Sequence, residues 1–215
     1  MKITCVADTH RSHNDLKLDR GDILIFAGDI DCWGNNAKLV LKDFSYWLKI
    51  QPFKYKIIIG GNHDELLEKL GYNIIKNDYF KEQDNIFYLE NNNCIIEGIK
   101  FWGSPITPAF NNWFFSANRG NEIAKIWKKI PKDTDVIITH GPPYGVLDET
   151  LRGEKVGCYD LGLAVIKIEP RYHIFGHIHL GGGKAVFQNG TTFINCSVLD
   201  EDYDLVNEPI IFNYE

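Results

Sequence analysis

The chain has 215 residues, of which 44% are hydrophobic and 24% are charged, and its formal net charge is -6 at pH 7. This length and composition are typical of a globular protein, so we expect a single domain over residues 1–215 and exclude fibrous and disordered classes. The acidic balance offers no basic surface for duplex DNA or for an anionic membrane, so neither is expected as a partner.

No apolar run approaches the roughly 20 residues that a membrane-spanning helix needs. The first residues lead into a polar motif and not into a signal-peptide cleavage site, which predicts a cytoplasmic protein. Five scattered cysteines without paired spacing indicate reduced core residues, and neither disulfides nor a thiolate metal site. The oligomeric state is open, with a homodimer as one expectation.

Short apolar runs rich in β-branched residues alternate with segments of helical periodicity. Such runs suit strands that are buried on both faces, and a strand-helix-strand rhythm predicts an α/β sheet. Apolar residues at helical spacing predict the helices. In chain order we expect strands at 3–7 and 23–27, a helix at 37–50, a strand at 55–59, a helix at 121–130, and strands at 136–139 and 172–175.

Further strands, expected to be antiparallel, follow from alternating patterns and turn residues. The Asn-Gly pair at residues 189–190 is a strong hairpin signal. The short glycine run at 181–183 predicts a loop beside the functional site. The expected segments are 93–98 paired with 99–103, then 184–187, 191–196 and 209–214.

Polar clusters stand at the ends of the five apolar strands. Ligand sites of open α/β sheets form outside the carboxyl ends of the strands, so these clusters can converge. Taken singly, an aspartate there is usually a turn or cap residue, and a histidine is usually paired with a carbonyl. Five such coincidences favour a metal site instead. The clusters are Asp8-Thr9-His10, Gly28-Asp29, Gly60-Gly61-Asn62-His63-Asp64, Thr139-His140-Gly141 and Gly176-His177-Ile178-His179.

The spacing within two clusters points to metal ligation. Asp8 and His10 are two residues apart, as are His177 and His179, so each pair leaves the same face of an extended chain. Asp29 follows Gly28 as a lone carboxylate whose two oxygens can bridge two cations. Imidazole and carboxylate ligands together suit first-row ions such as zinc, manganese or iron.

The ordered set of motifs resembles the calcineurin-like metallophosphoesterase superfamily over nearly the whole chain. Within it, Trp102-Gly103-Ser104-Pro105, Gly157-Cys158 and Phe175-Gly176-His177 are similar to the metallophosphoesterase-domain-containing proteins related to class III cyclic-nucleotide phosphodiesterases. The resemblance implies a four-layer α/β/β/α sandwich of two mixed β-sheets. It also implies metal ligands, which are Asp8, His10 and His179 for one ion, Asn62, His140 and His177 for the other, and Asp29 as the bridge.

The implied catalytic residues are His63 and Asp64. His63 would lie on the leaving-group side of the phosphate, and Asp64 would orient its imidazole through a hydrogen bond. The implied cofactors are two divalent ions, chosen from Mn, Fe, Zn, Co or Ni, with manganese expected in vitro. Together they activate water for hydrolysis of a phosphodiester bond in a small substrate, with a cyclic nucleotide as one candidate. A phosphomonoesterase, a nuclease and a non-catalytic protein-binding scaffold remain the alternatives.

Several residues near these motifs have two interpretations. Arg11 can bind a substrate phosphate or be a solvated loop residue, and Asp31 can add a carboxylate to the site or cap the next helix. His13 and His173 match no ligand position and are interpreted as structural. The aromatic segment 102–115 is either a packed loop or a wall that stacks a nucleobase.

Overall fold

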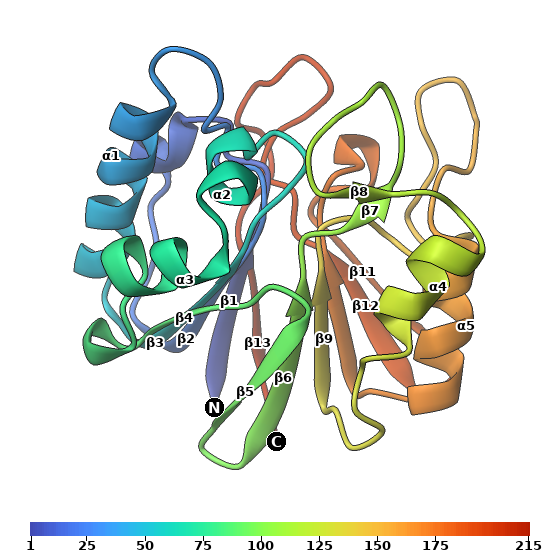
Figure 1. The fold of residues 1–215 in the computed structure, drawn as a ribbon. Helices are drawn as coiled ribbons and strands as arrows, with labels where there is room; N and C mark the ends of the chain where they lie inside the picture. Colours follow the sequence, from blue (N-terminus) through green and yellow to red (C-terminus); the bar gives the residue numbers. More distant parts are fainter.

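A computed structural model describes all residues from 1 to 215, and two β-sheets form its centre (Figure 1). The first sheet has five strands and the second has six. In spatial order the first contains β13 (Ile210–Asn213), β1 (Lys2–Val6), β2 (Gly21–Ala27), β3 (Phe53–Ile59) and β4 (Ile86–Tyr88). The second contains β11 (Lys184–Gln188), β12 (Thr191–Asn195), β10 (Tyr172–Phe175), β9 (Val136–Thr139), β6 (Ile99–Ser104) and β5 (Asn92–Ile96).

Both sheets are mixed. In the first, β1 to β4 are parallel and only β13 is antiparallel to its neighbour. In the second, β12, β10, β9 and β6 are parallel, whereas the two edge strands β11 and β5 are antiparallel to their neighbours. A small pair, β7 (Thr107–Pro108) and β8 (Ser116–Ala117), lies near the carboxyl ends of these strands (Figure 1).

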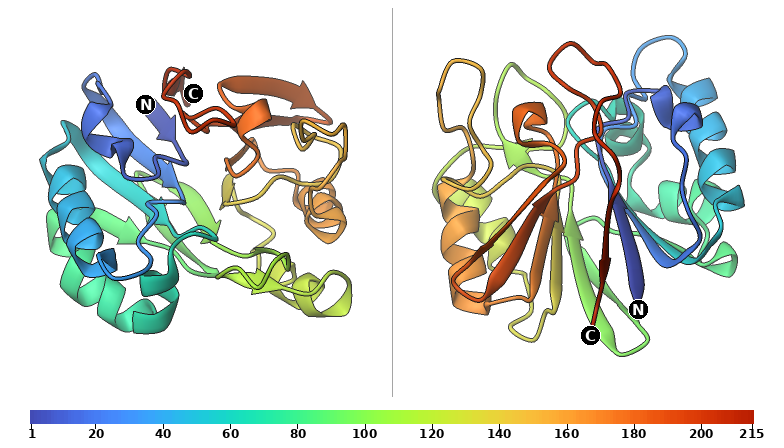
Figure 2. Two further views of the ribbon diagram at one scale, coloured as in Figure 1. Left: turned by 90° about the horizontal axis from the view of Figure 1, so that it is seen from above. Right: turned by 180° about the vertical axis from the view of Figure 1, so that it is seen from behind.

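Helices cover the outer face of each sheet, which gives four layers (Figures 1 and 2). On the first sheet lie α1 (Ala37–Ile50), α2 (Glu65–Leu70) and α3 (Tyr72–Ile74), and on the second lie α4 (Asn121–Trp127) and α5 (Tyr159–Ile168). Short helical segments complete the set: η1 (Ser12–Asp15), η2 (Ile75–Tyr79), η3 (Glu82–Asp84) and η4 (His179–Gly181). The four-layer α/β/β/α sandwich of two mixed sheets is therefore confirmed.

Strand periodicity explains the layers, because successive side chains of a strand point to opposite faces. On β2, Ile23 and Ile25 pack between the sheets, whereas Leu24 and Phe26 pack under α1. On the second sheet, Ile137 instead faces outward, toward α4 and α5. Each inner strand thus has apolar residues on both faces, which is why its sequence reads as a continuous apolar run.

Three details differ from the sequence-based expectation or extend it. The helix expected at 121–130 ends at Trp127, and β3 begins two residues earlier, at Phe53. Helix α5 was not predicted, because its cap is unusual: the Cys158 thiol accepts a hydrogen bond from the Leu161 N–H. All five cysteines are free. No helix is both long and apolar enough to cross a bilayer.

Candidate metal centre

The carboxyl ends of five parallel strands meet at one edge of the sandwich, where the loops gather in Figure 1. In the first sheet β1, β2 and β3 run side by side, and in the second β9 and β10 do. The residues that follow these five strands therefore face one another across the seam between the sheets. All seven expected ligands lie in these loops or in η4: Asp8, His10, Asp29, Asn62, His140, His177 and His179.

Asp29 occupies the centre of the cluster. Its Oδ2 lies 3.5 Å from Nε2 of His10 and 3.4 Å from Nε2 of His140. Its Oδ1 accepts a hydrogen bond from the backbone N–H of His63 at 2.9 Å. One carboxylate oxygen thus faces two groups of donors, which is the position that a bridging ligand needs.

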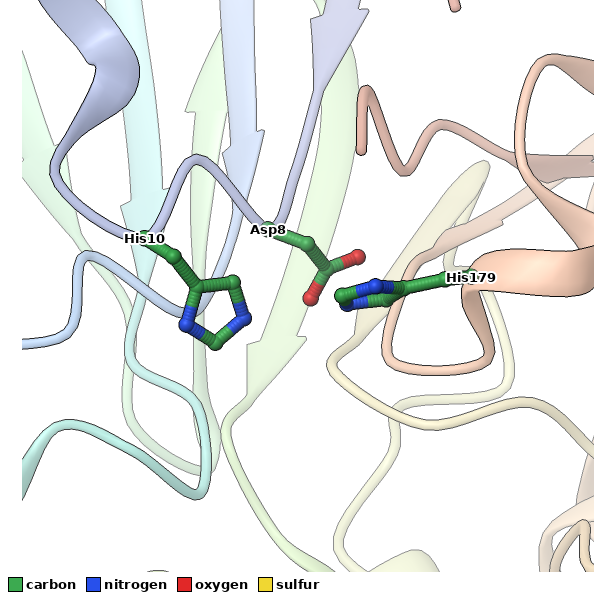
Figure 3. Close-up of side chains that lie close together, drawn as sticks. All are labelled: Asp8, His10 and His179. Atoms are coloured by element: carbon green, nitrogen blue, oxygen red, sulfur yellow. The ribbon is translucent and has the colours of Figure 1, made fainter. Parts of the chain in front are cut away.

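The first group of donors contains Asp8, His10 and His179, whose ligand atoms all lie within 4.8 Å of one another. In Figure 3 the carboxylate of Asp8 lies between the two imidazole rings. The Nδ1 of His179 is 2.8 Å from the carbonyl oxygen of Asp200. Because a carbonyl can only accept, Nδ1 carries the proton and Nε2 is left with a lone pair for a cation.

The second group contains Asn62, His140 and His177. Nδ1 of His140 donates to the carbonyl oxygen of Ala27 at 2.9 Å, so the neutral ring has its lone pair on Nε2. That Nε2 lies 2.9 Å from Oδ1 of Asn62, which is also an acceptor. The ring of His177 lies beside that of His140, with centroids 4.9 Å apart. With the amide of Asn62 in this orientation, its Oδ1 and Nε2 of His140 need a proton or a cation between them, and the buried Nδ2 has no hydrogen-bond partner.

The donors fit a divalent cation on the evidence of their unmet hydrogen bonds. Oδ1 of Asp8 is buried and has no hydrogen-bond partner, whereas Oδ2 accepts from the backbone N–H of His177 at 2.8 Å. Asp8 and Asp29 are also two carboxylates with at most 2% exposure. Buried charges of one sign are costly unless they are paired or coordinate a metal. Imidazole nitrogens and carboxylate oxygens suit first-row divalent ions.

The backbone of the site is strained and tightly packed. Asp8, Asp29 and His177 have φ values of 55°, 62° and 68°, in the left-handed region that non-glycine residues rarely adopt. Such conformations cost about 1–3 kcal/mol each and concentrate at functional sites. Gly61 and Gly176 lie so close to the carboxylates of Asp29 and Asp8, respectively, that a side chain would collide with them.

The charges of the site set the protonation of its histidines. Burial disfavours a charged His140, but the neighbouring Asp29 and Asp8 outweigh it and raise its pKa to about 9. Burial lowers the pKa of His177 to about 3, so its lone pair is free at neutral pH. In the absence of a cation a proton therefore occupies His140, and a bound ion would displace it.

Sequence comparison places the chain in a protein family. Residues 1–181 match the family model of calcineurin-like phosphoesterases. The chain is also 35% identical over 233 residues to metallophosphoesterase domain-containing protein 1 of Homo sapiens, which covers 99% of this chain and 70% of the human protein. The chain belongs to the calcineurin-like phosphoesterase family. Membership confirms the resemblance read from the motifs and supports metal-dependent hydrolysis of a phosphoester.

Other similar proteins extend the comparison. UPF0046 protein K07C11.7 of Caenorhabditis elegans is 35% identical over 227 residues, which cover 99% of this chain and 74% of that protein. Among solved structures, a phosphopantetheinyl hydrolase (PptH) from Mycobacterium tuberculosis aligns with a TM-score of 0.63 over 94% of this chain and 90% of that chain. Its sequence identity is 13%, so this similarity concerns the calcineurin-like fold alone.

In this calcineurin-like phosphoesterase His63 lies at the mouth of the site. Its ring centroid is 4.9 Å from that of His10 and 4.7 Å from that of Trp113. Nδ1 of His63 lies 3.7 Å from Oδ1 of Asp31, and 21% of the side chain is exposed. Burial lowers the pKa of His63. The ring is therefore accessible to a substrate, and its nitrogen, like a nitrogen of His10 and an oxygen of Asp31, belongs to a third set of ligand atoms that lie within 4.8 Å of one another.

The hydrogen bonds of Asp64 go to the backbone, whereas the resemblance implied one to the His63 ring. Its two oxygens accept hydrogen bonds from backbone N–H groups and make none with the His63 ring. The donors are the N–H groups of Gly61 at 2.8 Å, Asp29 at 3.1 Å, Ile30 at 3.3 Å, Asp31 at 3.0 Å and Cys32 at 3.4 Å. Asp64 thus ties the loop after β2 to the loop after β3, and the carboxylate beside His63 is Asp31.

Asp31 was underestimated from the sequence. Besides His63, it faces Nδ1 of His10 at 3.9 Å and accepts from Nε1 of Trp33 at 2.6 Å. Arg11 pairs with it at 2.7 Å, which explains the position of Arg11 without a phosphate. Asp31 does not cap α1, whose N-cap is Asn36. The position of Asp31, two residues after Asp29, was the sequence signal for a carboxylate at the site in addition to Asp8 and Asp29.

The remaining histidines and aromatic residues divide between core and site. Nε2 of His13 lies 2.9 Å from Asp43, and Nε2 of His173 lies 2.8 Å from the Thr139 hydroxyl, so both have structural partners, as expected. Trp102 is buried under α4, whereas Trp113 reaches the site. Tyr203 also contacts the site, and no sequence motif indicated it. Its ring lies 4.8 Å from that of His10 and 5.4 Å from that of His179.

Proposed function

We propose that this protein uses two divalent ions to hydrolyse a phosphodiester bond in a small substrate, with a cyclic nucleotide as the candidate. Manganese is the proposed ion in vitro, with iron, zinc, cobalt or nickel as alternatives. The proposed ligands are Asp8, His10 and His179 for one ion, Asn62, His140 and His177 for the other, and Asp29 for both.

The position of Asp29 carries this proposal. One oxygen of its carboxylate lies about equally far from His10 and His140, at 3.5 and 3.4 Å, and these histidines belong to different donor groups. A mononuclear site would need only one such group. Bound ions would hold the phosphoryl oxygens and lower the pKa of the attacking water.

His63 is proposed to assist the leaving group. It lies beside the donor groups, it is accessible, and it has Asp31 on the Nδ1 side. A carboxylate near Nδ1 favours the tautomer with the proton there, which leaves Nε2 to exchange a proton with the substrate. Because the pKa of His63 is lowered by burial, its protonated form is a strong acid toward the leaving oxygen.

A small substrate agrees with the charge of the chain. Its formal net charge is -6, so long polyanions would not be attracted to the molecule as a whole. The neutral Asn62 limits the negative charge beside the two buried aspartates. The single domain, the cytoplasmic location and a homodimeric state stay predictions.

The test is hydrolysis of bis-p-nitrophenyl phosphate by protein loaded in turn with manganese, iron, cobalt and zinc. Matched concentrations of p-nitrophenyl phosphate and single-stranded DNA distinguish the alternatives. We expect the diester to be hydrolysed fastest. Faster hydrolysis of the monoester or of DNA would replace the proposed substrate class, and inactivity with every ion would reject a phosphoesterase.

A further inference from the structure

Strand β11 forms an open edge of the second sheet (Figures 1 and 2). All five of its residues are exposed, which is true of no other strand, and Phe187 is 75% exposed. Edge strands are usually bulged, covered or interrupted by proline or charges, because their free backbone groups pair readily with other strands. Strand β11 has a continuous register with β12, no proline and a single charge, that of Lys184.

The turn that follows β11 determines which of its backbone groups point outward. The turn at 189–190 has two residues, with φ values of 51° and 83°. Such a turn is flanked by a hydrogen-bonded pair, here Gln188 and Thr191, and hydrogen-bonded pairs alternate along an antiparallel ladder. The N–H and C=O groups of Ala185 and Phe187 therefore point away from β12, and neither residue has a backbone hydrogen bond to a turn or loop.

The two faces of β11 carry different side chains. Val186 is paired with Phe193, which packs under α5, so Val186 lies on the face that the helices cover. Ala185 is paired with Ile194, which packs between the sheets, so Ala185 and Phe187 lie on the opposite face. A strand added at this edge must therefore match one aliphatic side chain on the first face and a small and a large side chain on the second.

A second copy of β11 meets these requirements. In an antiparallel pair centred on Val186, a two-fold axis passes between the two Val186 residues, as in an isologous dimer. Ala185 of each strand then lies opposite Phe187 of the other, so a small side chain faces a large one. These two residues also carry the outward backbone groups, and each pair can exchange both of its hydrogen bonds.

Charge also favours a second copy as the partner. The only charged side chain of β11, that of Lys184, lies opposite the neutral Gln188 in this register. At about 3.3 Å per residue the two lysines are roughly 13 Å apart along the strands, which exceeds the Debye length of about 8 Å at physiological ionic strength. The strand contains no acidic residue, although the chain has a net charge of -6. Two acidic molecules can thus pair here without opposing like charges in the strands.

We propose that β11 is the interface of a two-fold homodimer, in which it pairs antiparallel with β11 of a second copy around Val186. The pairing joins the two six-stranded sheets into one continuous sheet. Two five-residue strands cover less than the roughly 800 Å² per partner of a stable complex, so the dimer forms at micromolar concentrations and dissociates on dilution. Strand β11 contributes no residue to the metal centre, so the inference does not depend on the proposed function.

Disulfide trapping tests the register. In the central pair, which is not hydrogen-bonded, the Cα atoms lie about 4.5 Å apart, within the range that a disulfide spans. Val186→Cys should therefore cross-link two copies under mild oxidation, seen by non-reducing gel electrophoresis. Phe187→Cys is the matched control, because its counterpart lies roughly 7 Å further along the strand, and it should cross-link at least about tenfold more slowly. The wild type, with four buried cysteines and one half-buried, gives the background.

A charge exchange tests the interface in solution by analytical ultracentrifugation of the full chain. Val186→Asp and Val186→Lys each oppose like charges at the two-fold axis, so each should weaken self-association at least about tenfold. A mixture of the two variants pairs opposite charges and should restore the dimer. Val186 is 37% exposed, so both variants should keep the wild-type melting temperature within a few degrees. Leu39→Asp, at a 68% exposed position on α1, is the control and should leave association unchanged.

Three results would overturn the inference. A wild type that stays monomeric up to about 100 µM would show that the edge does not pair with a second copy, and would leave it to a strand of another protein. A dimer that Val186→Asp does not weaken would place the interface elsewhere on the molecule. Equal cross-linking of Val186→Cys and Phe187→Cys would contradict the register. All three outcomes leave the proposed hydrolysis untouched, because metal content and turnover are measured separately.

Discussion

The metal centre has a floor and a rim that are built in different ways. Floor residues are at most 2% exposed; they are Asp8, Asp29, Asn62 and His140. Backbone groups fix most of them, as when His177 N–H binds Asp8 and His140 binds the Ala27 carbonyl. Rim residues lie at the mouth and make side-chain contacts, Asp31 and Trp113 with His63, and Tyr203 with His10; the rim residues are Asp31, His63, Trp113 and Tyr203.

The floor and the rim are therefore expected to determine different properties of the site. The floor contains buried charges on a strained backbone. The buried charges are needed to hold ions, and the close packing leaves little room for other side chains. The rim is accessible, so it can exchange protons and choose substrates. Substitutions in the floor should therefore change metal content, whereas substitutions in the rim should change rate or selectivity at constant metal content.

The largest effect is expected for Asp29→Ala. Because Asp29 faces both donor groups, its loss should lower the metal content from two ions to one or none. Phosphodiester hydrolysis should fall by about 10³-fold or more, since each ion supplies several kcal/mol of charge stabilisation. Metal analysis and turnover of bis-p-nitrophenyl phosphate check this. Asp133→Ala is the control, because Asp133 is 72% exposed. Retention of two ions by Asp29→Ala would contradict a shared ligand.

His63→Ala tests the rim. We expect near-normal manganese content and a turnover reduced by about two to four orders of magnitude, the range for losing general acid-base assistance. A substrate with a good leaving group such as p-nitrophenolate should be affected less than one with an alkyl leaving group. A large loss of bound metal would instead show that His63 is a metal ligand.

Asp31→Asn tests whether Asp31, the carboxylate beside the His63 ring, orients that ring. The change removes the charge beside Nδ1 of both His10 and His63, so turnover should fall about 10- to 100-fold, as for other residues that orient ligands. The melting temperature should change little. An unaltered rate would show that Asp31 only anchors Arg11 and Trp33.

Asp64→Asn should behave in the opposite way. An amide offers one acceptor oxygen in place of two, so several of the backbone N–H groups around it would lose their partners. The free energy of unfolding should fall by about 2–4 kcal/mol, measured by urea denaturation of the metal-free protein. A loss of turnover at unchanged stability would restore the catalytic role that the sequence suggested.

The smallest effect, about tenfold per pH unit, concerns the proton on His140. Its pKa is raised from 6.5 to about 9, so a cation must displace this proton, and manganese affinity should increase with pH up to about 9. The free energy of unfolding of the metal-free protein should change with pH in the opposite direction. The protonated His140 beside Asp29 stabilises it fully below pH 6.5 and loses this effect as the pH rises through about 9. Calorimetry in buffers of different ionisation enthalpy measures the released proton.

The sequence predicted the floor well because it depends on strand ends. Parallel strands align their carboxyl ends, so the residues that follow the five apolar runs come together once the two sheets form. Family resemblance then assigned Asp29 the central position, and the geometry supports that assignment. The layers of the sandwich were predictable for the same reason, since continuous apolar runs require cover on both faces.

The rim was less predictable because it depends on turns and long-range contacts. Asp64 precedes α2, yet its backbone partners other than Gly61 are N–H groups of a loop more than 30 residues earlier, which no local spacing encodes. Tyr203 reaches the site only through the geometry of one turn. Helix α5 lacked a conventional cap, because a thiol at Cys158 accepts its first hydrogen bond.

Each donor group draws on both halves of the sandwich, and this has a mechanical consequence. Asp8 and His10 follow a strand of the first sheet and His179 follows one of the second, while Asn62 faces His140 in the same way. A cation held in either group would act as a cross-link between the halves. Chelation would then loosen the molecule along its middle, and resistance to heat or proteolysis would serve as a gauge of metal loading.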